Sequence, residues 1–167
     1  FKQLWIDFFY FLARGIYNEA DKVITLFERN RKIQLDLGLD RRRSLVIPNG
    51  VDPEKYNFKK IDHDGINLGA ILRIVPIKDV KTLIRAFRII ADRKEKVRLY
   101  LMGPYEEDLD YYQQCQQLVK DFKLEEQVFF LGKIDVIKYM KYMDLLILTS
   151  ISEGQPLVIL EGMAAGL

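Results

Sequence analysis

Short apolar runs alternate with amphipathic stretches through the second half of the chain. The apolar runs are residues 66–72, 97–102, 127–131 and 144–149. Between the first two, apolar side chains recur at helical spacing at Val80, Leu83, Ile84, Phe87 and Ile90. A regular alternation of strands and helices predicts βαβ units and a parallel sheet. Because the strands are apolar on both faces, we expect a Rossmann-like α/β sheet with helices on both faces.

Residues 1–58 carry a shorter version of the same pattern. We expect a strand at residues 22–27, a helix at 28–37 that Gly38 closes in the left-handed conformation, and a strand at 45–47. The polar segment 57–65 is typical of a linker, and we expect its single histidine, His63, to be solvated. We therefore assign residues 1–58 to the end of a preceding domain with an interdomain segment, and residues 59–167 to a ligand-binding Rossmann-like domain.

The opening helix is rich in aromatic residues. Its apolar side chains recur at helical spacing at Leu4, Trp5, Phe8, Phe11 and Ile16. Charged residues interrupt the run, which is shorter than the roughly 18–20 apolar residues that span a bilayer. We predict a helix that is buried or packs against a domain, with an interfacial membrane contact as the alternative.

Composition limits the possible functions. The net charge of +2 gives no argument for a nucleic-acid surface, and the single histidine excludes a site of several histidines. The single cysteine, Cys115, allows no internal disulfide and suits a reducing compartment such as the cytoplasm. The chain begins at Phe1 and stops at Leu167 inside an expected helix, so we expect it to be an internal fragment of a longer protein.

Two cations follow the first strand of the second half. Ligands of parallel sheets bind at the carboxyl ends of the strands, where Arg73 and, five residues later, Lys78 are expected. An arginine fork and a lysine ammonium together neutralise a diphosphate, although two solvated loop cations are the alternative. The G-x-G-x-x-G fingerprint of dinucleotide-binding domains is absent from the sequence.

Two glutamates, Glu153 and Glu161, are separated by seven intervening residues across an expected strand–turn–helix junction. Pro156 suits the first helical turn, where its missing N–H costs nothing. The backbone N–H groups of Leu157 and Val158 then face the crevice as unpaired donors at the positive end of the helix dipole. The alternative is that both glutamates are ordinary acids favoured by a helix N-terminus.

Taken together, these segments resemble the retaining GT-B glycosyltransferases of family 4. The resemblance rests on PNGVD at residues 48–52, on Arg73 with Lys78, and on SEGQPLVILE at residues 152–161. Within that family the chain is most similar to the Pel exopolysaccharide branch. That closer likeness lies in VPIKDVKT at 75–82, in Gly103-Pro104 followed by Glu107-Asp108, and in TSISEGQPLV at 149–158. Leu72 and Asp79 stand where many members have glycine.

The resemblance implies the truncated C-terminal half of a GT-B fold with part of the preceding domain. It implies a hexosyltransferase whose catalytic residues are Glu153, Arg73 and Lys78. The donor-binding roles follow the family motif: Arg73 and Lys78 on the phosphates with the backbone of Leu157 and Val158, Glu161 on the ribose, Glu153 on the sugar, and Gly103 and Ile134 beside the base.

The same resemblance implies a nucleotide-sugar donor linked to UDP, a glycan or lipid-linked acceptor, and neither a metal nor another cofactor. It also implies a cytoplasmic protein in exopolysaccharide biosynthesis, with peripheral association to a membrane polysaccharide complex. Three alternatives stay open: a non-catalytic nucleotide-binding or regulatory module, a Rossmann-like oxidoreductase domain, and an interaction protein built on the aromatic helix.

Overall fold

The computed structural model describes residues 2–93 and 96–167 in two compact units that divide after Gly50. The first unit contains α1 (Lys2–Glu19), β1 (Val23–Thr25), α2 (Glu28–Asp36), the 3-10 helix η1 (Arg41–Arg43) and β2 (Ser44–Val46). Strands β1 and β2 pair in parallel, and α2 forms the crossover that packs on both. Gly38 follows α2 with φ +101, which confirms its expected left-handed role.

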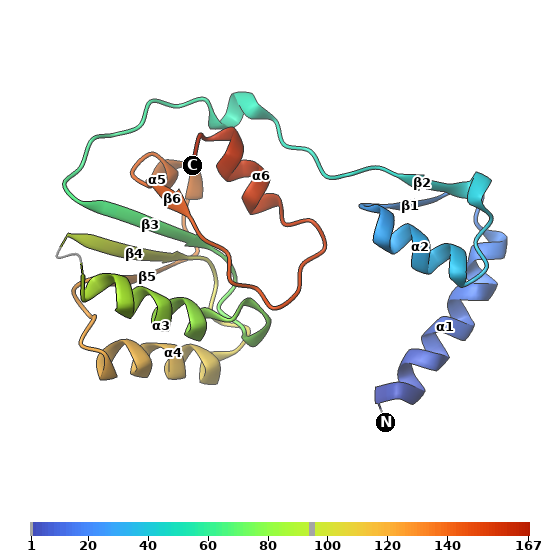
Figure 1. The fold of residues 1–167 in the computed structure, drawn as a ribbon, viewed down its shortest axis with the longest axis horizontal. Helices are drawn as coiled ribbons and strands as arrows, with labels where there is room; N and C mark the ends of the chain where they lie inside the picture. The colour runs from blue at the N-terminus through green and yellow to red at the C-terminus, as the bar shows by residue number, and fades with distance from the viewer. Residues whose placement is uncertain (1, 94–95) are drawn as a thin grey trace. The chain divides into compact units, whose positions relative to one another are not determined.

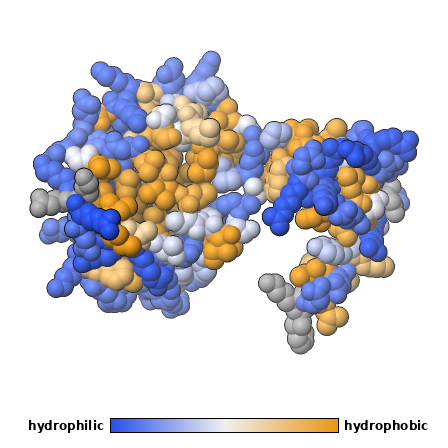
Figure 2. All heavy atoms as spheres, in the orientation of Figure 1, coloured by the Kyte–Doolittle hydropathy of each residue, from blue (hydrophilic) through white to orange (hydrophobic). Residues whose placement is uncertain are grey.

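The apolar side chains of α1 are on the surface of the described chain. Leu4, Trp5, Phe8, Phe11 and Ile16 are 49–74% exposed. Figure 2 shows hydrophobic side chains on the surface of this part of the chain. The expected burial of this helix is therefore wrong within these residues, and packing against a further domain stays a prediction. Within residues 2–93 and 96–167, no helix has the length and apolar character that crossing a bilayer requires.

The second unit is built on a four-stranded parallel sheet (Figure 1). Its strands are β3 (Ile66–Ile71), β4 (Val97–Met102), β5 (Val128–Gly132) and β6 (Leu145–Leu146), in the order β5-β4-β3-β6. Its helices are α3 (Val80–Ala91), α4 (Leu109–Asp121), α5 (Val136–Met140) and α6 (Leu157–Ala164), with the 3-10 helices η2 (Pro53–Tyr56) and η3 (Pro76–Lys78). Helices α3 and α4 cover one face and α6 the other, which confirms the predicted α/β class.

The core of this unit follows the helical spacing seen in the sequence. Val80, Leu83, Ile84 and Phe87 of α3 are each at most 2% exposed and pack with the side chains of β3 and β4. Burying one such side chain contributes about 1.5–3 kcal/mol, so this face of α3 holds the sheet beneath the candidate site.

The last strand is shorter and more exposed than residues 144–149 predicted. Only Leu145–Leu146 form β6, and Leu145 is 49% exposed. The reason is position: β6 pairs with β3, and its outer edge has no partner strand among the described residues. Figure 2 shows the apolar surface that gathers over β6 and α6 as a result.

The segment before β3 is fixed to the unit and does not behave as a free linker. His63 was expected to be solvated, but its side chain is only 18% exposed and its Nε2 lies 3.4 Å from Asp144 Oδ2. The amide of Ile61 also donates to the Lys141 carbonyl at 2.9 Å. These contacts come from the β5–β6 connection, far away in the sequence, so local polarity alone gave the wrong prediction.

Candidate functional site

The strand order reverses at β3, so the loops that follow β3 and β6 lie at the same carboxyl edge of the sheet. The chain proceeds from β3 outward through β4 to β5, then crosses back to add β6 on the other side of β3. Ligands of open parallel sheets bind at such a reversal, because the neighbouring loops leave in opposite directions. Arg73 follows β3 and residues 149–153 follow β6, so the reversal brings these two predicted segments to the same edge.

Lys78 and Glu153 form a direct ion pair at this edge. The Nζ of Lys78, at the end of η3, lies 2.5 Å from Glu153 Oε1, and the two side chains are only 19% and 24% exposed. The hydrogen bond from Lys78 lowers the pKa of Glu153, so this carboxylate stays charged at neutral pH. The structure thus joins the residue expected on the diphosphate to the residue expected on the sugar.

The backbone around this ion pair is held by a bifurcated hydrogen bond from Thr149 and by one backbone hydrogen bond between the two loops. The Thr149 hydroxyl lies 3.1 Å from the carbonyl oxygen of Lys78 and 3.2 Å from that of Asp79, and donates to them. The amide of Ile151 donates to the Ile77 carbonyl at 2.9 Å. Thr149 therefore fixes the end of η3, and with it the start of the Lys78 side chain, against the loop that carries Glu153.

Replacing Thr149 with valine is expected to lower the free energy of unfolding by about 0.5–1.5 kcal/mol. Valine keeps the shape of the side chain but removes the donor to the two carbonyls. Thr149→Ser keeps the hydroxyl and is the matched control. Urea unfolding of the three proteins measures the difference, and a valine variant as stable as the serine variant contradicts the proposed clamp.

Arg73 is held by Glu107, for which we predicted no role in the site. Its Nη1 lies 2.5 Å from Glu107 Oε2, with both side chains about half exposed at 51% and 56%. Glu107 stands between β4 and α4, just before Asp108, whose side chain caps α4 by accepting from the Tyr111 amide. The position of Glu107 after the carboxyl end of β4 could have indicated this contact, because the loops at the carboxyl ends of parallel strands lie at the edge that carries Arg73.

The helix of the second glutamate begins one residue later than expected. Pro156 is the residue before the helix, with φ −70 and ψ 116, and α6 starts at Leu157. Leu157 and Val158 therefore still supply N–H groups of the first turn, which have no partner within the helix. The first turn of α6 contains no acidic residue, and Glu161 lies on the second turn. Glu161 is thus not a capping acid.

The helix that carries Glu161 packs against η2, which ends at Tyr56. Burial is the main reason that the pKa of Tyr56 is raised, and the neighbouring Glu161 raises it further. No motif pointed to Tyr56, because the contact joins segments that are far apart in the sequence.

Gly103 and Ile134 follow the adjacent strands β4 and β5. Gly103 has φ +143, and a Cβ added there would lie 2.0 Å from the Leu72 carbonyl oxygen, so a larger residue does not fit. Its amide donates to the Gly132 carbonyl at 2.8 Å, which ties the two strand ends together. Ile134 is half-buried in the loop that leads to α5. Both predicted residues thus reach the edge that carries Arg73.

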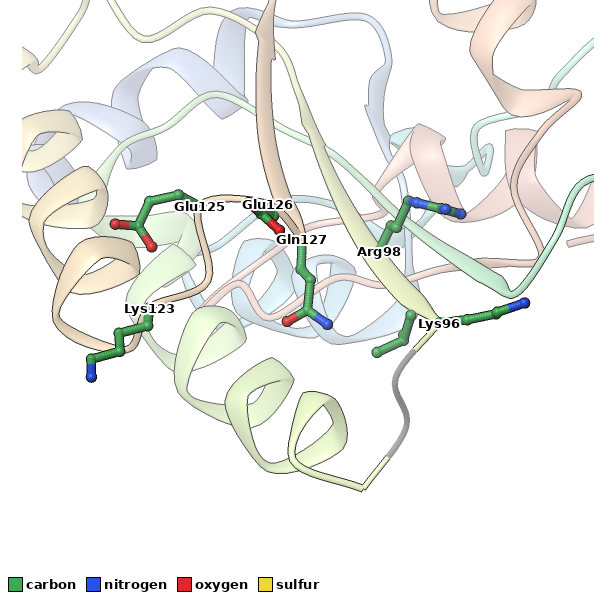
Figure 3. A pocket seen from close by; sticks show the side chains of 7 residues that line it. Lys96, Arg98, Lys123, Glu125, Glu126 and Gln127 are labelled. Atoms are coloured by element: carbon green, nitrogen blue, oxygen red, sulfur yellow. The ribbon is translucent and has the colours of Figure 1, made fainter.

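A separate hollow of about 590 Å³ lies at the amino ends of β4 and β5 (Figure 3). Its lining carries both signs of charge, from Lys96, Arg98 and Lys123 to Glu125 and Glu126. Lys96 and Arg98 already contact Asp64, at 2.6 and 2.9 Å. The carboxyl edge of the sheet carries the Lys78–Glu153 pair and Arg73, so we place the candidate site there. Across the described part of the chain, no cluster of three or more His, Cys, Asp or Glu is arranged to hold a metal ion.

Two known enzymes are similar in sequence to this chain. The chain is 28% identical to the alpha-monoglucosyldiacylglycerol synthase of Streptococcus pneumoniae over 93% of its own length and 38% of the synthase. It is 36% identical to the N-acetyl-alpha-D-glucosaminyl L-malate synthase of Bacillus anthracis, over 90% of the chain and 33% of that enzyme. The chain therefore spans less than half the length of these relatives.

Solved structures show the same architecture. Anabaena HepE in complex with UDP matches with a TM-score of 0.75 and 25% identity, over 87% of this chain and 43% of that one. Staphylococcus aureus TarM, in complex with fondaparinux, alpha-GlcNAc-glycerol and UDP, matches with a TM-score of 0.71 and 25% identity, over 89% and 29%. The expected GT-B relationship is confirmed.

Two family models divide the chain near the boundary between the compact units. A domain of unknown function (DUF3492) matches residues 1–42, and the model described as glycosyl transferases group 1 matches residues 52–167. The second match covers more than half of the chain and includes every residue predicted for the site. This protein belongs to the glycosyl transferases group 1 family.

Proposed function

We propose that this chain is the donor-binding part of a retaining GT-B glycosyltransferase of family 4, from the Pel exopolysaccharide branch. The whole enzyme moves a hexose from a UDP-sugar to a glycan or lipid-linked acceptor. One observation supports the proposal: the loops after β3 and β6, where the strand order reverses, join Lys78 to Glu153 in an ion pair, with Arg73 at the end of β3 and α6 following Glu153 in the chain. Because the chain spans only part of its relatives, the experiments below use the full-length protein.

The division of residues 1–58 and 59–167 into an acceptor-side piece with an interdomain segment and a donor domain is part of this proposal. The cytoplasm, and peripheral association with a membrane polysaccharide complex, are the proposed setting. UDP in the bound states of HepE and TarM supports a uridine donor. The glycolipid synthase among the relatives supports a lipid-linked or glycan acceptor.

Each charged group has a proposed task in the reaction. The bond between the anomeric carbon and the diphosphate oxygen breaks, an acceptor hydroxyl oxygen bonds to that carbon, and UDP leaves with the electron pair and takes up the proton of the hydroxyl. Arg73, Lys78 and the N–H groups of Leu157 and Val158 stabilise the negative charge that develops on the diphosphate. Arg73 gives one nitrogen to Glu107 and keeps further N–H donors for phosphate oxygens.

Recognition of the donor is assigned to the remaining residues. Glu161 accepts hydrogen bonds from the ribose, while Gly103 and Ile134 lie beside the base. Glu153 accepts from hydroxyl groups of the sugar. In the structure the Glu153 carboxylate is paired with Lys78. Binding of a diphosphate therefore draws Lys78 toward the phosphates and releases the carboxylate for the sugar.

UDP is expected to stabilise the full-length protein in a thermal-shift screen against GDP, ADP and NAD. A ligand present at 100 times its dissociation constant adds about 2.7 kcal/mol to the free energy of unfolding. Arg73→Ala combined with Lys78→Ala is the matched control and is expected to lose the shift. An equal or larger shift with NAD, and none with UDP, contradicts the proposed donor.

Binding of UDP is expected to survive EDTA. Protein cations and helix N–H groups carry the charge of the diphosphate in this proposal, so chelation removes nothing that the donor needs. Titration calorimetry with and without EDTA measures the effect. Loss of UDP binding on chelation, with recovery on addition of Mg²⁺ or Mn²⁺, counts against the assigned roles of Arg73 and Lys78.

A further inference from the structure

The backbone on both sides of Arg73 is hydrogen-bonded to the chain at the carboxyl end of β4. The amide of Leu72 donates to the Met102 carbonyl at 2.9 Å. Two residues later, the amide of Ile74 donates to the Pro104 carbonyl, also at 2.9 Å. Leu72 and Ile74 are buried, at 6% and 1% exposure. The start of the Arg73 side chain is therefore fixed relative to the loop that leads from β4 to α4.

The other end of that loop is fixed by α4. Asp108 caps this helix, because its side chain accepts from the Tyr111 amide at 2.9 Å, and Tyr111 is part of the hydrophobic core. Glu107 stands directly before the cap. Its Oε2 accepts a hydrogen bond from Arg73 Nη1 at 2.5 Å, across 34 positions of the sequence. Both partners of this ion pair thus come from backbone that is held in place.

The ion pair of Arg73 and Glu107 contributes more to geometry than to stability. Its two side chains are about half exposed, and exposed ion pairs add little to the free energy of unfolding. An arginine is a long side chain that ends in a planar fork of five N–H groups. Holding Nη1 on the carboxylate restricts this fork and leaves further N–H donors for a ligand. A side chain that is already ordered loses less conformational freedom when the ligand binds.

We propose that Glu107 is a positioning residue of the donor site. It holds the Arg73 guanidinium so that the remaining N–H groups face the diphosphate, and it touches no part of the donor itself. The inference rests on the proposed function, in which Arg73 binds the diphosphate. The carboxylate also opposes the negative charge of the phosphates. Water and salt screen that repulsion between exposed groups, so the positioning effect prevails.

The experiment measures UDP affinity by titration calorimetry on the full-length protein and its variants. Glu107→Ala is expected to weaken UDP binding by about 3–10-fold, because the ligand must then order the Arg73 side chain. Glu107→Gln is expected to retain part of that affinity, since its amide oxygen still accepts from Nη1. In an Arg73→Ala background, Glu107→Ala is expected to cause no further loss. Glu106→Ala, on the same loop, is the matched control and is expected to change the affinity by a factor of about two or less.

The outcomes separate this inference from the function on which it rests. If the unmodified protein does not bind UDP, or if Arg73→Ala binds it equally well, the diphosphate role of Arg73 is wrong and the role of Glu107 falls with it. If Arg73→Ala weakens binding but Glu107→Ala leaves it unchanged or strengthens it, only the positioning role is overturned. An equal loss from Glu107→Ala in both backgrounds overturns it as well, because a residue that merely supports the loop has that effect.

Discussion

Replacing Lys78 with methionine is expected to weaken UDP binding by about 10–150-fold. A charge-assisted contact to phosphate contributes about 1.5–3 kcal/mol, which corresponds to that range of affinity. The structure adds a second reason for a large effect. When the Lys78 ammonium, 2.5 Å from Glu153 Oε1, is removed, the negative charge of the Glu153 carboxylate is left unpaired. This charge then repels the incoming diphosphate. Titration calorimetry of the folded variant measures the change.

The matched control is Lys81→Met on the first turn of α3. The Lys81 Nζ contacts Gln114 and lies 4.9 Å from the centre of the Tyr111 ring. Its ammonium group therefore interacts with α4. Its replacement is expected to leave UDP affinity within a factor of about two, since surface changes away from a site shift free energies by roughly 0.5 kcal/mol or less. Unchanged UDP affinity in Lys78→Met refutes the diphosphate role of this residue.

The cost to folding differs between the two cations of the site. Arg73 is about half exposed, so Arg73→Ala is expected to change stability by only about 0.5 kcal/mol. Lys78 is a loop cation in sequence, but its side chain is 19% exposed and paired with a carboxylate that is equally sheltered. Breaking that pair leaves an uncompensated charge, so the unfolding of each Lys78 variant has to be measured beside its affinity.

The sheet and its helices were predictable because their signals are local. Four apolar runs separated by helical periodicity were enough to place β3, α3, β4, α4 and β5. The rule that ligands bind at strand carboxyl ends then placed Arg73, Lys78 and Glu153 at one edge. The length and exposure of β6 were not predictable in this way. They depend on which strand lies beside its outer edge, and a run of apolar residues does not carry that information.

The parts of the site that the sequence missed are contacts over long separations. Glu107 meets Arg73, and η2 packs against the helix that carries Glu161, and both contacts join segments far apart in the chain. The ion pair of Lys78 with Glu153 was missed for the same reason, although each residue was identified alone. Family motifs name the residues that touch a ligand, but they do not say which protein groups hold those residues when the ligand is absent.

The two glutamates are expected to respond differently to UDP and to UDP-glucose, used here as the sugar-nucleotide probe. Glu161→Gln is expected to weaken both ligands, because both contain the ribose and an amide only partly replaces a carboxylate that accepts from two hydroxyls. Glu153→Gln is expected to weaken UDP-glucose but not UDP. The affinity for UDP is expected to stay the same or to rise modestly, because the substitution frees Lys78 from its carboxylate partner.

Among the expected effects of substituting the two glutamates, the loss of turnover is the largest. In the full-length enzyme Glu153→Gln is expected to reduce transfer by roughly 10–1000-fold, because a carboxylate beside the sugar stabilises positive charge that develops at the anomeric carbon. Glu126→Gln, at the opposite end of the sheet, is the matched control and is expected to leave both turnover and UDP affinity unchanged. The reverse pattern, in which Glu153→Gln abolishes UDP binding and Glu161→Gln is silent, means that the two roles are exchanged. If neither substitution affects either ligand, the seven-residue spacing of the glutamates has no part in donor binding, and the crevice beside α6 is not the donor site.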